Sequence, residues 1–260
     1  MSPGGARGPL DGQVALVTGA GTGVGRGIAL ALAAAGAAVV VAAHHRDSGA
    51  LVEASIRDRG GEALCVECDV TDRAAVAAAV AAAVGGFGSL DIVVANAVSN
   101  RSNEAVELER PPEDLWEQHA SVSLRGLLHC AQLAHPHLAR RGGALLVLLS
   151  PAGIQGSERN AFYAAVKGAQ RGFVKSLSRE WGADDIRVNG LAPLAVTPAL
   201  DKAFAQDPTM HDRLVSFIPS GRIGDPETDI GPAAAFLCGP GARYVLGQTL
   251  VVSGGRFTAL

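Results

Sequence analysis

The chain has 260 residues, of which 22 are basic and 25 acidic, and its formal net charge is −3. This length is long for one hydrophobic core but normal for an α/β domain. The near balance of charge predicts no nucleic-acid partner, and the apolar stretches, which are short or broken by charge, predict no membrane association. We therefore expect a cytoplasmic enzyme that acts on a small molecule.

Predicted strands and helices alternate along the chain. Apolar runs predict strands near residues 13–18, 38–43, 63–68, 91–95, 144–149, 185–190 and 247–252. Helical stretches are predicted near residues 24–35, 48–59, 72–84, 113–140, 160–181 and 226–238. Because most of the strands are unbroken Val, Leu and Ala runs, we predict an α/β fold with a doubly wound parallel sheet, covered on both faces. Ligands should bind at the carboxyl ends of its strands.

The domain organisation predicted from the sequence is simple. Residues 1–10 are rich in Gly and Pro and lack the apolar core of a signal peptide, so they predict a flexible tail. Residues 11–260 predict a single catalytic domain, because no long linker divides them. Within it, residues 194–224 interrupt the alternation with Pro, Gly and scattered apolar side chains, which is typical of a small lobe or lid over a substrate.

A glycine-rich turn follows the first predicted strand. Glycines occupy every second position from Gly19 to Gly27 and lead into an alanine-rich helix. A strand, a glycine turn and a helix N-terminus form an anion site, because free N–H groups and the helix dipole face the turn. The spacing does not match the common G-x-G-x-x-G pattern, and a merely flexible turn remains the alternative.

The four cysteines are too few for a disulfide framework in a chain of this size. Cys65 and Cys68 have the C-x-x-C spacing of some metal and redox sites. They lie in a predicted strand, however, where residues three apart face opposite sides of the sheet. We interpret them as small core residues and expect no metal site.

Tyr163 and Lys167 begin the fifth predicted helix, shortly after the strand that Ser150 closes. The i, i+4 spacing places phenol and ammonium on one helix face. A nearby cation moves the pKa of a tyrosine, ordinarily roughly 10, toward neutrality, so Tyr163 can exchange protons with a substrate. Ser150 can donate a hydrogen bond to a substrate oxygen. Taken alone, such a pair also arises by chance, and a serine at a strand end is often only a cap.

With these motifs in place, the chain resembles the short-chain dehydrogenase/reductase family over about residues 10 to 257. The resemblance is carried, in order, by TGAGTGVG (18–25), Cys68-Asp69-Val70, FGSLDIVVANA (87–97), LLSPAG (148–153), Tyr163-xxx-Lys167, IRVNGLAP (186–193) and GQTLVVSGG (247–255). It implies a Rossmann fold that binds NAD(H) or NADP(H), and a homo-oligomer, dimer or tetramer, formed through the fourth and fifth helices and the C-terminal strand.

The resemblance also implies the roles of single residues. Tyr163 would be the general acid/base, Lys167 would lower its pKa and hold the nicotinamide ribose, and Ser150 would orient the substrate. Asp69 would hydrogen-bond the adenine, and Asn96 would support the central strand and the ribose. The implied cofactor-binding residues are Gly19, Thr22, Gly23, Val24, Gly25, His44, His45, Arg46, Asp69, Val70, Asn96, Ala97, Tyr163, Lys167, Pro193 and Thr197.

The end of the second strand predicts a preference for NADP(H). Relatives that prefer NAD carry an aspartate there, which binds the ribose 2′-hydroxyl and repels a 2′-phosphate. This chain has Ala43, followed by His44, His45 and Arg46, which could pair with a phosphate. The alternative is that these three residues form an ordinary polar loop.

Three departures from the family pattern lie near the nicotinamide end. Val98 stands where the family has glycine, and the segment between Pro193 and Thr197 is one residue short. The family's asparagine of the fourth helix, which fixes a water linking the lysine to solvent, is Ser123 here. We expect Ser123 to serve this proton relay with the help of a second water.

The predicted function is an NADP(H)-dependent oxidoreductase that interconverts a ketone and a secondary alcohol. A non-redox enzyme, such as an epimerase, dehydratase or cyclase of secondary metabolism, is the alternative that the three departures suggest. A catalytically silent binding protein is disfavoured, because Ser150, Tyr163 and Lys167 are all present. The polar loop 99–103, with apolar residues at 154, 194, 204 and 217, predicts a medium-sized, partly hydrophobic carbonyl substrate.

Overall fold

The computed structural model describes residues 8–102 and 104–258 of the chain. Seven strands form one parallel sheet in the order β3-β2-β1-β4-β5-β6-β7. Their bounds are β1 (Val14–Thr18), β2 (Ala38–Ala43), β3 (Ala63–Glu67), β4 (Ile92–Ala95), β5 (Ala144–Leu148), β6 (Arg187–Pro193) and β7 (Thr249–Val252). The strand order reverses between β1 and β4, so the prediction of a doubly wound parallel sheet is confirmed.

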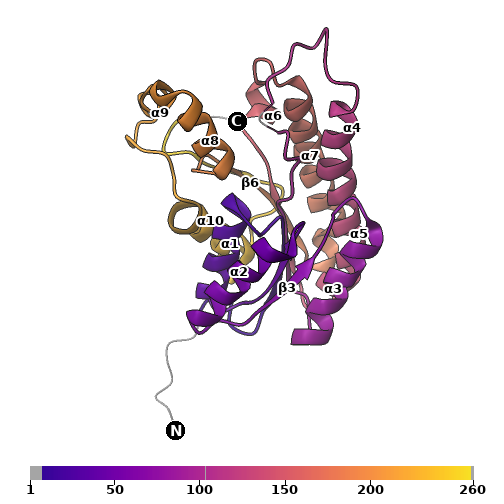
Figure 1. Ribbon diagram of the computed structural model, residues 1–260. Coiled ribbons are helices and arrows are strands. Elements are labelled where there is room, and N and C mark those ends of the chain that lie inside the picture. The colour runs from indigo at the N-terminus through magenta and orange to yellow at the C-terminus, as the bar shows by residue number, and fades with distance from the viewer. Residues whose placement is uncertain (1–7, 103, 259–260) are drawn as a thin grey trace.

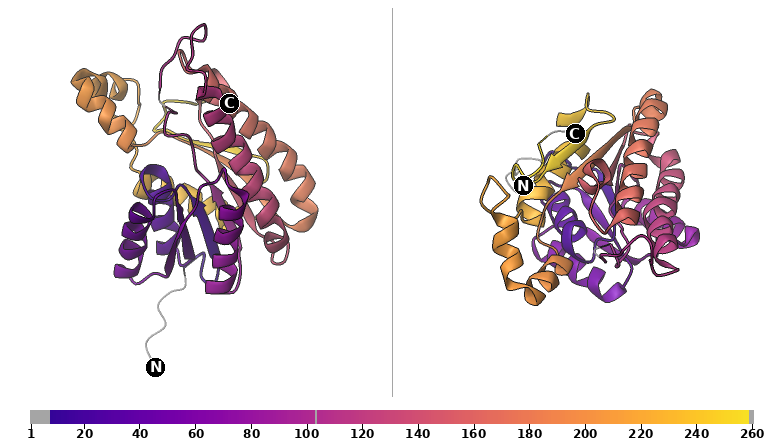
Figure 2. Two further views of the ribbon diagram at one scale, coloured as in Figure 1. Left: turned by 45° about the vertical axis from the view of Figure 1, so that its right-hand side comes forward. Right: turned by 90° about the horizontal axis from the view of Figure 1, so that it is seen from above.

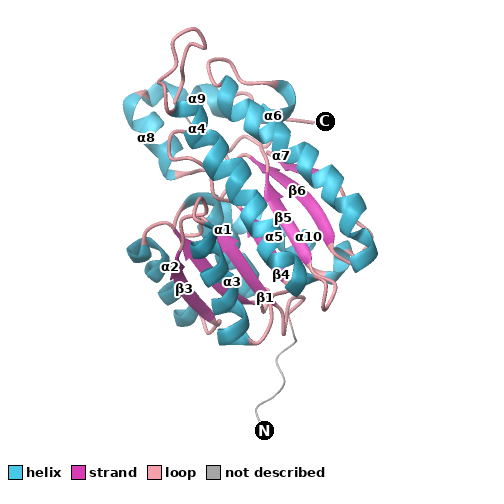
Figure 3. Cartoon of the chain, turned by 90° about the vertical axis from the view of Figure 1, so that its right-hand side faces the viewer, coloured by secondary structure: helices cyan, strands magenta, loops and turns pink. Residues whose placement is uncertain are grey.

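Helices connect the strands and cover both faces of the sheet (Figures 1 and 3). The α-helices are α1 (Gly23–Ala34), α2 (Arg46–Asp58), α3 (Arg73–Phe87), α4 (Leu115–Ala120), α5 (Gly126–Leu138), α6 (Ala152–Gln155), α7 (Ala161–Glu180), α8 (Pro198–Gln206), α9 (Pro208–Val215) and α10 (Gly231–Cys238). Two π-helical turns, η1 (Ser121–Arg125) and η3 (Pro226–Ile230), and two 3-10 turns, η2 (Trp181–Asp184) and η4 (Pro240–Ala242), complete the order. No described helix is both long and apolar enough to span a membrane.

Two apolar cores lie on opposite faces of the sheet. Alternate residues of β1 divide between them, Val14 and Leu16 in one core and Ala15 and Val17 in the other. Helices α3, α5 and α7 contribute to the first core, and α1, α2 and α10 to the second. Figure 1 shows the two helix groups on either side of the sheet. Burial on both faces explains why the strands are continuous apolar runs.

The predicted helix at 113–140 begins two residues late and contains a π-helical turn. Helix α4, the turn η1 and helix α5 follow one another without a break, and the residues at the junctions keep helical dihedral angles. A π turn inserts one extra residue into a helix and occurs frequently at functional sites. Ser123 lies inside this turn, so its orientation could not be derived from a regular helical period.

The strand predicted at 185–190 is observed at Arg187–Pro193 instead. The 3-10 turn η2 occupies residues 181–184, and Asp185 then adopts a left-handed conformation with φ of 56°. A non-glycine residue in this conformation ends a helix and cannot begin a strand. The strand therefore starts two residues later than its apolar pattern predicts.

The beginning of the chain packs on the domain earlier than predicted. Leu10 is fully buried, and its N–H donates to the Ala35 carbonyl over 2.9 Å. Residue 10 thus belongs to the packed structure and not to a flexible tail, because its side chain joins the core that α1 covers. The rest of the predicted tail, residues 1–7, lies outside the described residues.

Cys65 and Cys68 face opposite sides of the sheet, as predicted. The Cys65 thiol lies beside Gly49 of α2 and donates to the Arg46 carbonyl, whereas Cys68 joins the core on the other face. Burial raises the pKa of both thiols, that of Cys68 to about 11. Both are therefore protonated, unreactive core residues near neutrality.

Residues 194–224 leave the sheet and return to it. Helices α8 and α9 stand clear of the sheet on the side of α1 (Figure 2). The two ends of the segment are joined, because Ala195 pairs with Gly224 and the Val196 N–H donates to the Gly224 carbonyl over 2.9 Å. The segment therefore leaves the carboxyl end of β6 and returns to it, so that its two ends lie side by side.

Candidate active site

The turn between β1 and α1 is shaped so that side chains are kept out of it. Gly19 and Gly23 have φ angles of 63° and 55°, a region that residues with a Cβ rarely adopt. A Cβ on Gly25 would lie 2.3 Å from the Gly19 carbonyl oxygen, and one on Gly21 would lie 2.4 Å from the Ser48 hydroxyl. The turn can therefore bring its backbone close to a ligand.

The same turn leaves the N-terminus of α1 open to an anion. The N-cap residue Thr22 makes no side-chain hydrogen bond to the first turn, and this turn holds no acidic residue. The N–H groups at the start of this 12-residue helix therefore have no side-chain partner, and the positive end of its dipole is not neutralised. These features fit the diphosphate of a dinucleotide cofactor.

A hollow separates the glycine turn from the start of the 194–224 segment. Its lining residues are Gly21, Thr22, Gly23, Arg26, Val196, Thr197, Pro198, Asp201, Asp225, Pro226 and Glu227. A Cβ on Gly23 would lie within 3.8 Å of Thr197 and Pro198, so this segment borders the cofactor turn directly. The Thr197 hydroxyl caps α8 by accepting from the Leu200 N–H over 3.2 Å.

The end of β2 presents a polar, exposed surface. Ala43 closes the strand, and the next three residues, His44, His45 and Arg46, are all exposed. Arg46 begins α2, whose N-cap residue His45 makes no side-chain hydrogen bond to the helix. Among the described residues Arg46 forms no ion pair. Its guanidinium is therefore not neutralised by a protein carboxylate.

Asp69 follows β3 and is held in place by its own loop. Its carboxylate accepts from the Thr71 N–H over 2.9 Å and from the Thr71 hydroxyl over 2.8 Å. Burial pushes the pKa of Asp69 upward, but these two hydrogen bonds and the nearby His44 keep it below the usual value. The side chain is thus an ionised acceptor in a fixed orientation near the end of β2.

Asn96 joins the ends of β1 and β4 at the base of the glycine turn. Its amide nitrogen donates to the carbonyls of Thr18 and Gly19 over 2.9 and 3.1 Å. The Thr18 hydroxyl in turn accepts from the Asn96 N–H over 3.1 Å and donates to the Val94 carbonyl over 3.3 Å. These bonds fix the two strands relative to each other. Val98, two residues further on, is 39% exposed.

Ser150, Tyr163 and Lys167 meet at the carboxyl end of β5. Ser150 follows this strand, its hydroxyl lies close enough to Tyr163 to influence the pKa of that phenol, and it accepts a hydrogen bond from the Ala152 N–H over 3.2 Å. The Lys167 ammonium lies 5.8 Å from the centre of the Tyr163 ring. The three residues that the sequence singles out for catalysis are therefore brought together from β5 and α7.

The protonation of this group differs from the sequence-based prediction. Burial raises the pKa of Tyr163, and the neighbouring Ser150 hydroxyl, not the lysine, opposes this rise. Burial lowers the pKa of Lys167 to about 7, so its ammonium is partly neutral near neutral pH. It lies over the Tyr163 ring and donates to the Leu148 carbonyl over 2.6 Å and to the Gln170 Oε1 over 2.9 Å.

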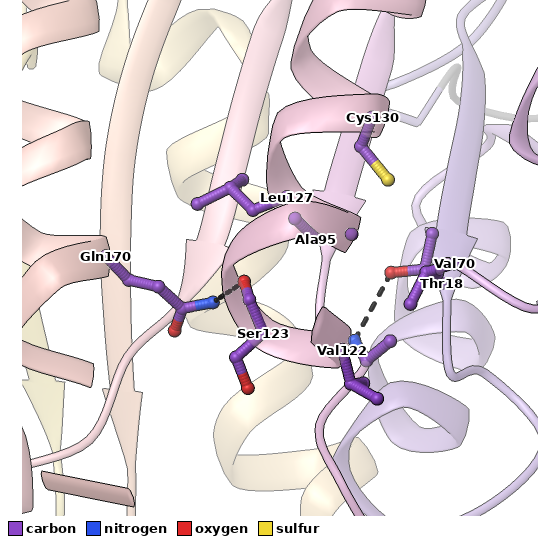
Figure 4. A pocket seen from close by; sticks show the side chains of 10 residues that line it. Thr18, Val70, Ala95, Val122, Ser123, Leu127, Cys130 and Gln170 are labelled. Atoms are coloured by element: carbon purple, nitrogen blue, oxygen red, sulfur yellow. Dashed lines mark hydrogen bonds between the residues drawn. The ribbon is translucent and has the colours of Figure 1, made fainter. Parts of the chain in front are cut away.

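Gln170 is a residue of the site that the sequence analysis did not identify. It is 2% exposed, and its Nε2 donates to the backbone carbonyl of Ser123 over 2.8 Å (Figure 4). The Ser123 hydroxyl is fully buried, points away from this amide, and has no hydrogen-bond partner among the described residues. The available signal was the i, i+3 spacing from Lys167, which places Gln170 on the same helix face.

His119 of α4 is a second buried polar residue near the site. It is fully buried, its ring centre lies 6.3 Å from that of Tyr163, and neither ring nitrogen has a hydrogen-bond partner within the described part of the chain. Burial and the positive charge of Arg101 lower its pKa. His119 is therefore neutral near physiological pH.

The polar loop after β4 does not offer a free charge to a substrate. Arg101 binds both oxygens of Glu104, over 2.6 and 3.0 Å, and also contacts Asp114 over 2.9 Å. The loop is fastened to the start of α7, because the Asn160 side chain donates to the Ser102 carbonyl over 2.8 Å. Residue 103 of the predicted loop lies outside the described residues.

Comparison with known proteins shows the family to which the chain is similar. A family model described as enoyl-(acyl carrier protein) reductase matches residues 19–256. The chain is 34% identical over 248 residues to 7alpha-hydroxysteroid dehydrogenase of Escherichia coli (strain K12), which covers 95% of this chain and 94% of that protein. It is 36% identical over 246 residues to 3-oxoacyl-(acyl-carrier-protein) reductase FabG of Staphylococcus aureus (strain N315), with coverages of 94% and 97%.

Solved structures extend the likeness to the fold. A 7 alpha-hydroxysteroid dehydrogenase complexed with NADH and 7-oxo glycochenodeoxycholic acid superimposes with a TM-score of 0.88 at 34% identity, covering 97% of this chain and 98% of that one. A gluconate 5-dehydrogenase from Burkholderia cenocepacia J2315 in complex with NADP and tartrate superimposes with a TM-score of 0.87 at 34% identity, covering 96% of this chain and 97% of that one. The chain belongs to the short-chain dehydrogenase/reductase family.

Proposed function

We propose that this chain is an NADP(H)-dependent oxidoreductase that interconverts a ketone and a secondary alcohol. Membership of the family supports an NAD(P)-dependent oxidoreductase in general. The observation that carries the specific proposal is the placement of Ser150 beside Tyr163 at the carboxyl end of β5, with the Lys167 ammonium 5.8 Å from the centre of the phenol ring. Oxidoreductases that act on a C–O bond need such a proton donor beside the reacting oxygen.

When bound, the nicotinamide supplies or accepts the hydride, and the protein residues handle the proton. Ser150 donates a hydrogen bond to the substrate oxygen and holds it against Tyr163. In reduction the Tyr163 hydroxyl gives its proton to this oxygen, and in oxidation the phenolate takes the proton back. The raised pKa of Tyr163 keeps it protonated near neutral pH, so its hydroxyl can act as the proton donor in reduction.

The residues around the cofactor turn fit a dinucleotide. The open N-terminus of α1 would bind the diphosphate, Asp69 would accept from the adenine, and Asn96 would hold the turn beneath the ribose. Thr197 borders the turn, so the 194–224 segment would close over cofactor and substrate, with Ile154, Leu194 and Phe204 on the apolar side of the site.

The function is tested by following reduced nicotinamide absorbance with a panel of ketones, using Tyr163→Phe as the diagnostic variant. General acid/base catalysis is worth about 10²–10⁴ in rate, so we expect turnover to fall by that factor while cofactor affinity stays within about twofold. Tyr244→Phe is the matched control, because Tyr244 is the other tyrosine of the chain and is 96% exposed. Retention of more than half the rate in Tyr163→Phe would contradict the proposal.

The same assay separates the non-redox alternative. A product that forms from a substrate without net change in nicotinamide absorbance would support an epimerase, dehydratase or cyclase. No product and no absorbance change, with the cofactor bound, would support a binding protein.

The preference for NADP(H) rests on the end of β2. The similar solved structures hold NADH in one case and NADP in another, so the preference has to come from this chain's own residues. Ala43 offers no carboxylate, Arg46 is exposed and unpaired among the described residues, and the N-terminus of α2 lacks a side-chain cap. Each of these features favours a phosphate over a hydroxyl.

We expect NADPH to bind at least about tenfold more tightly than NADH, which corresponds to about 1.4 kcal/mol. Dissociation constants from fluorescence titration measure this difference. Ala43→Asp should reverse the preference, because its carboxylate repels a 2′-phosphate and accepts from a 2′-hydroxyl. Ala43→Ser is the control without charge and should keep the order. Equal affinities in the wild type would overturn the assignment.

A further inference from the structure

A continuous hydrogen-bonded chain connects the Lys167 ammonium to the backbone of the π turn η1. Lys167 donates to Gln170 Oε1 over 2.9 Å, and Gln170 Nε2 donates to the Ser123 carbonyl over 2.8 Å. Lys167 and Gln170 are 3% and 2% exposed, and Ser123 is fully buried. Figure 4 shows the Gln170 amide directed at Ser123 while the Ser123 hydroxyl points away. The backbone of Ser123, and not its side chain, is the partner in this chain.

Between Lys167 and Ser123, the carboxamide of Gln170 makes the hydrogen bonds that a water would make there, but it cannot transfer a proton. A water can accept from the ammonium, donate to the carbonyl and also exchange protons with its neighbours. The Gln170 side chain offers the same acceptor and donor, but its NH₂ group has no lone pair available and its oxygen is already engaged. The bridge therefore holds the ammonium and at the same time blocks proton transfer through η1.

Because of the groups that surround Lys167, the Gln170 amide is important for stabilising the positive charge of this lysine. β5 contributes the Leu148 carbonyl and α7 the phenol of Tyr163. The buried His119 of α4 has its ring centre 6.3 Å from that of Tyr163, and Gly153 of α6 packs against the backbone of Lys167. No carboxylate among the described residues forms an ion pair with Lys167. The Leu148 carbonyl and Gln170 Oε1 are thus the acceptors available to a buried cation, whose pKa burial lowers to about 7.

We propose that Gln170 is a positioning residue that holds the Lys167 ammonium in place of a bridging water and closes the buried route from this lysine to solvent past Ser123. Protons then reach Tyr163 from the side of the cleft where Ser150 lies. The inference uses the proposed function only in taking Lys167 as the partner of Tyr163.

The test measures the ammonium itself, so it needs neither substrate nor cofactor. The chain has three lysines, Lys167, Lys175 and Lys202, and ¹³Cε labelling of lysine therefore gives three signals. Lys175→Arg and Lys202→Arg assign the two others, and titration of the third signal from pH 5 to 11 yields the pKa of Lys167. A failure of the Tyr163→Phe test would leave this measurement intact, and the reverse also holds.

Three variants of Gln170 separate the possible roles. Gln170→Leu has similar size but no acceptor, so we expect the pKa of Lys167 to fall by about 1, because a hydrogen bond to a charged group is lost. Gln170→Glu places a carboxylate beside the ammonium and should raise this pKa by a similar amount. Gln170→Ala leaves room for water, so the pKa should stay nearer the wild-type value than in Gln170→Leu, and solvent exchange of the ammonium protons, measured by ¹⁵N NMR, should become severalfold faster.

Ser123→Ala distinguishes the amide bridge from a side-chain relay. It removes a hydroxyl that has no described partner and should leave both the pKa and the exchange rate of Lys167 unchanged. If Gln170→Leu and Gln170→Glu each leave the pKa within about 0.3 of wild type, a difference too small for a lost or gained charge-assisted bond, Gln170 does not hold the ammonium. If Gln170→Ala exchanges no faster than wild type, the closed route is refuted. If Gln170→Leu does not fold, Gln170→Glu and Gln170→Ala decide both points.

Discussion

The Lys167 ammonium is the residue-scale feature on which the electrostatics of the site depends. The side chain is 3% exposed, and burial lowers its pKa to about 7, compared with about 10.4 in an unfolded chain. Between these two values the unfolded chain binds one more proton than the folded one. The contribution of Lys167 to the free energy of unfolding therefore rises with pH across this window, because folding then requires less work to bury this lysine in its neutral form.

We predict that the melting temperature of the cofactor-free protein rises from pH 7 to about pH 8.5, with a contribution from Lys167 of at most about 1.4 kcal/mol per pH unit. Above about pH 8.5 the four buried thiols work in the opposite direction, and above about pH 10 Tyr163 does so too, because raised pKa values keep these groups protonated in the folded state only. Scanning calorimetry measures the profile. Lys167→Met should flatten it and stabilise the protein below pH 7, whereas Lys175→Met should leave it unchanged. A Lys167→Met profile parallel to wild type would refute this account.

Ser123 and Thr197 show that residue identity alone does not specify the contacts of a hydroxyl. The resemblance assigns the Ser123 position to a side-chain relay and Thr197 to the cofactor. In the structure the Ser123 hydroxyl has no described partner, and the Thr197 hydroxyl caps α8.

At the scale of elements, the glycine turn and helix α1 form one unit. Gly25 lies in the first turn of α1, where a Cβ would approach the Gly19 carbonyl oxygen to 2.3 Å and the Asn96 amide to 2.4 Å. Neither group can move freely, because Asn96 bonds the carbonyls of Thr18 and Gly19. The close packing of helix on strand therefore requires glycine at this position.

We predict that Gly25→Ala destabilises the protein by about 2 kcal/mol or more and weakens cofactor binding, because overpacking forces the turn apart. Gly85→Ala is the matched control in α3, where a Cβ would meet no atom within 4 Å. It should stabilise the protein by about 0.5–1 kcal/mol, the difference in helix propensity. Chemical denaturation and cofactor titration measure both effects. Equal stability of the two variants would contradict the packing argument.

At the scale of the whole molecule, two exposed apolar surfaces suit self-association. Trp116 of α4 and Leu128 of α5 are 44% and 39% exposed, and Phe236 and Leu250 are exposed around α10 and the edge strand β7. Large exposed apolar side chains near a free sheet edge are typical of subunit interfaces. These surfaces include the fourth helix and the C-terminal strand, through which the resemblance implies pairing.

We predict a dimer or tetramer in solution, measured as a molar mass two or four times that of one chain by light scattering. Leu250→Arg should reduce the assembly, because it buries an unpaired charge at the interface. Leu51→Arg is the control, since Leu51 is 74% exposed on α2, outside both surfaces. A monomeric wild type, or equal masses for wild type and Leu250→Arg, would refute this interface.

The sequence by itself determined the parts that depend on neighbouring residues. Mostly unbroken apolar runs predicted the seven strands, because the inner strands of a parallel sheet are buried on both faces. Glycine spacing predicted the turn at the start of α1, and the i, i+4 spacing placed Tyr163 and Lys167 together. Element ends were less accurate, as at 185–190, where the left-handed Asp185 delays the strand.

Only the tertiary structure decided which side chains meet across elements. Gln170 and Ser123 are 47 residues apart, and their hydrogen bond depends on a π turn whose extra residue shifts the helical period. The same holds for the orientation of the Lys167 ammonium toward Leu148 and for the burial of His119. Local periodicity specifies which face of an element is buried, but close packing between elements decides which polar atoms find a partner there and which do not.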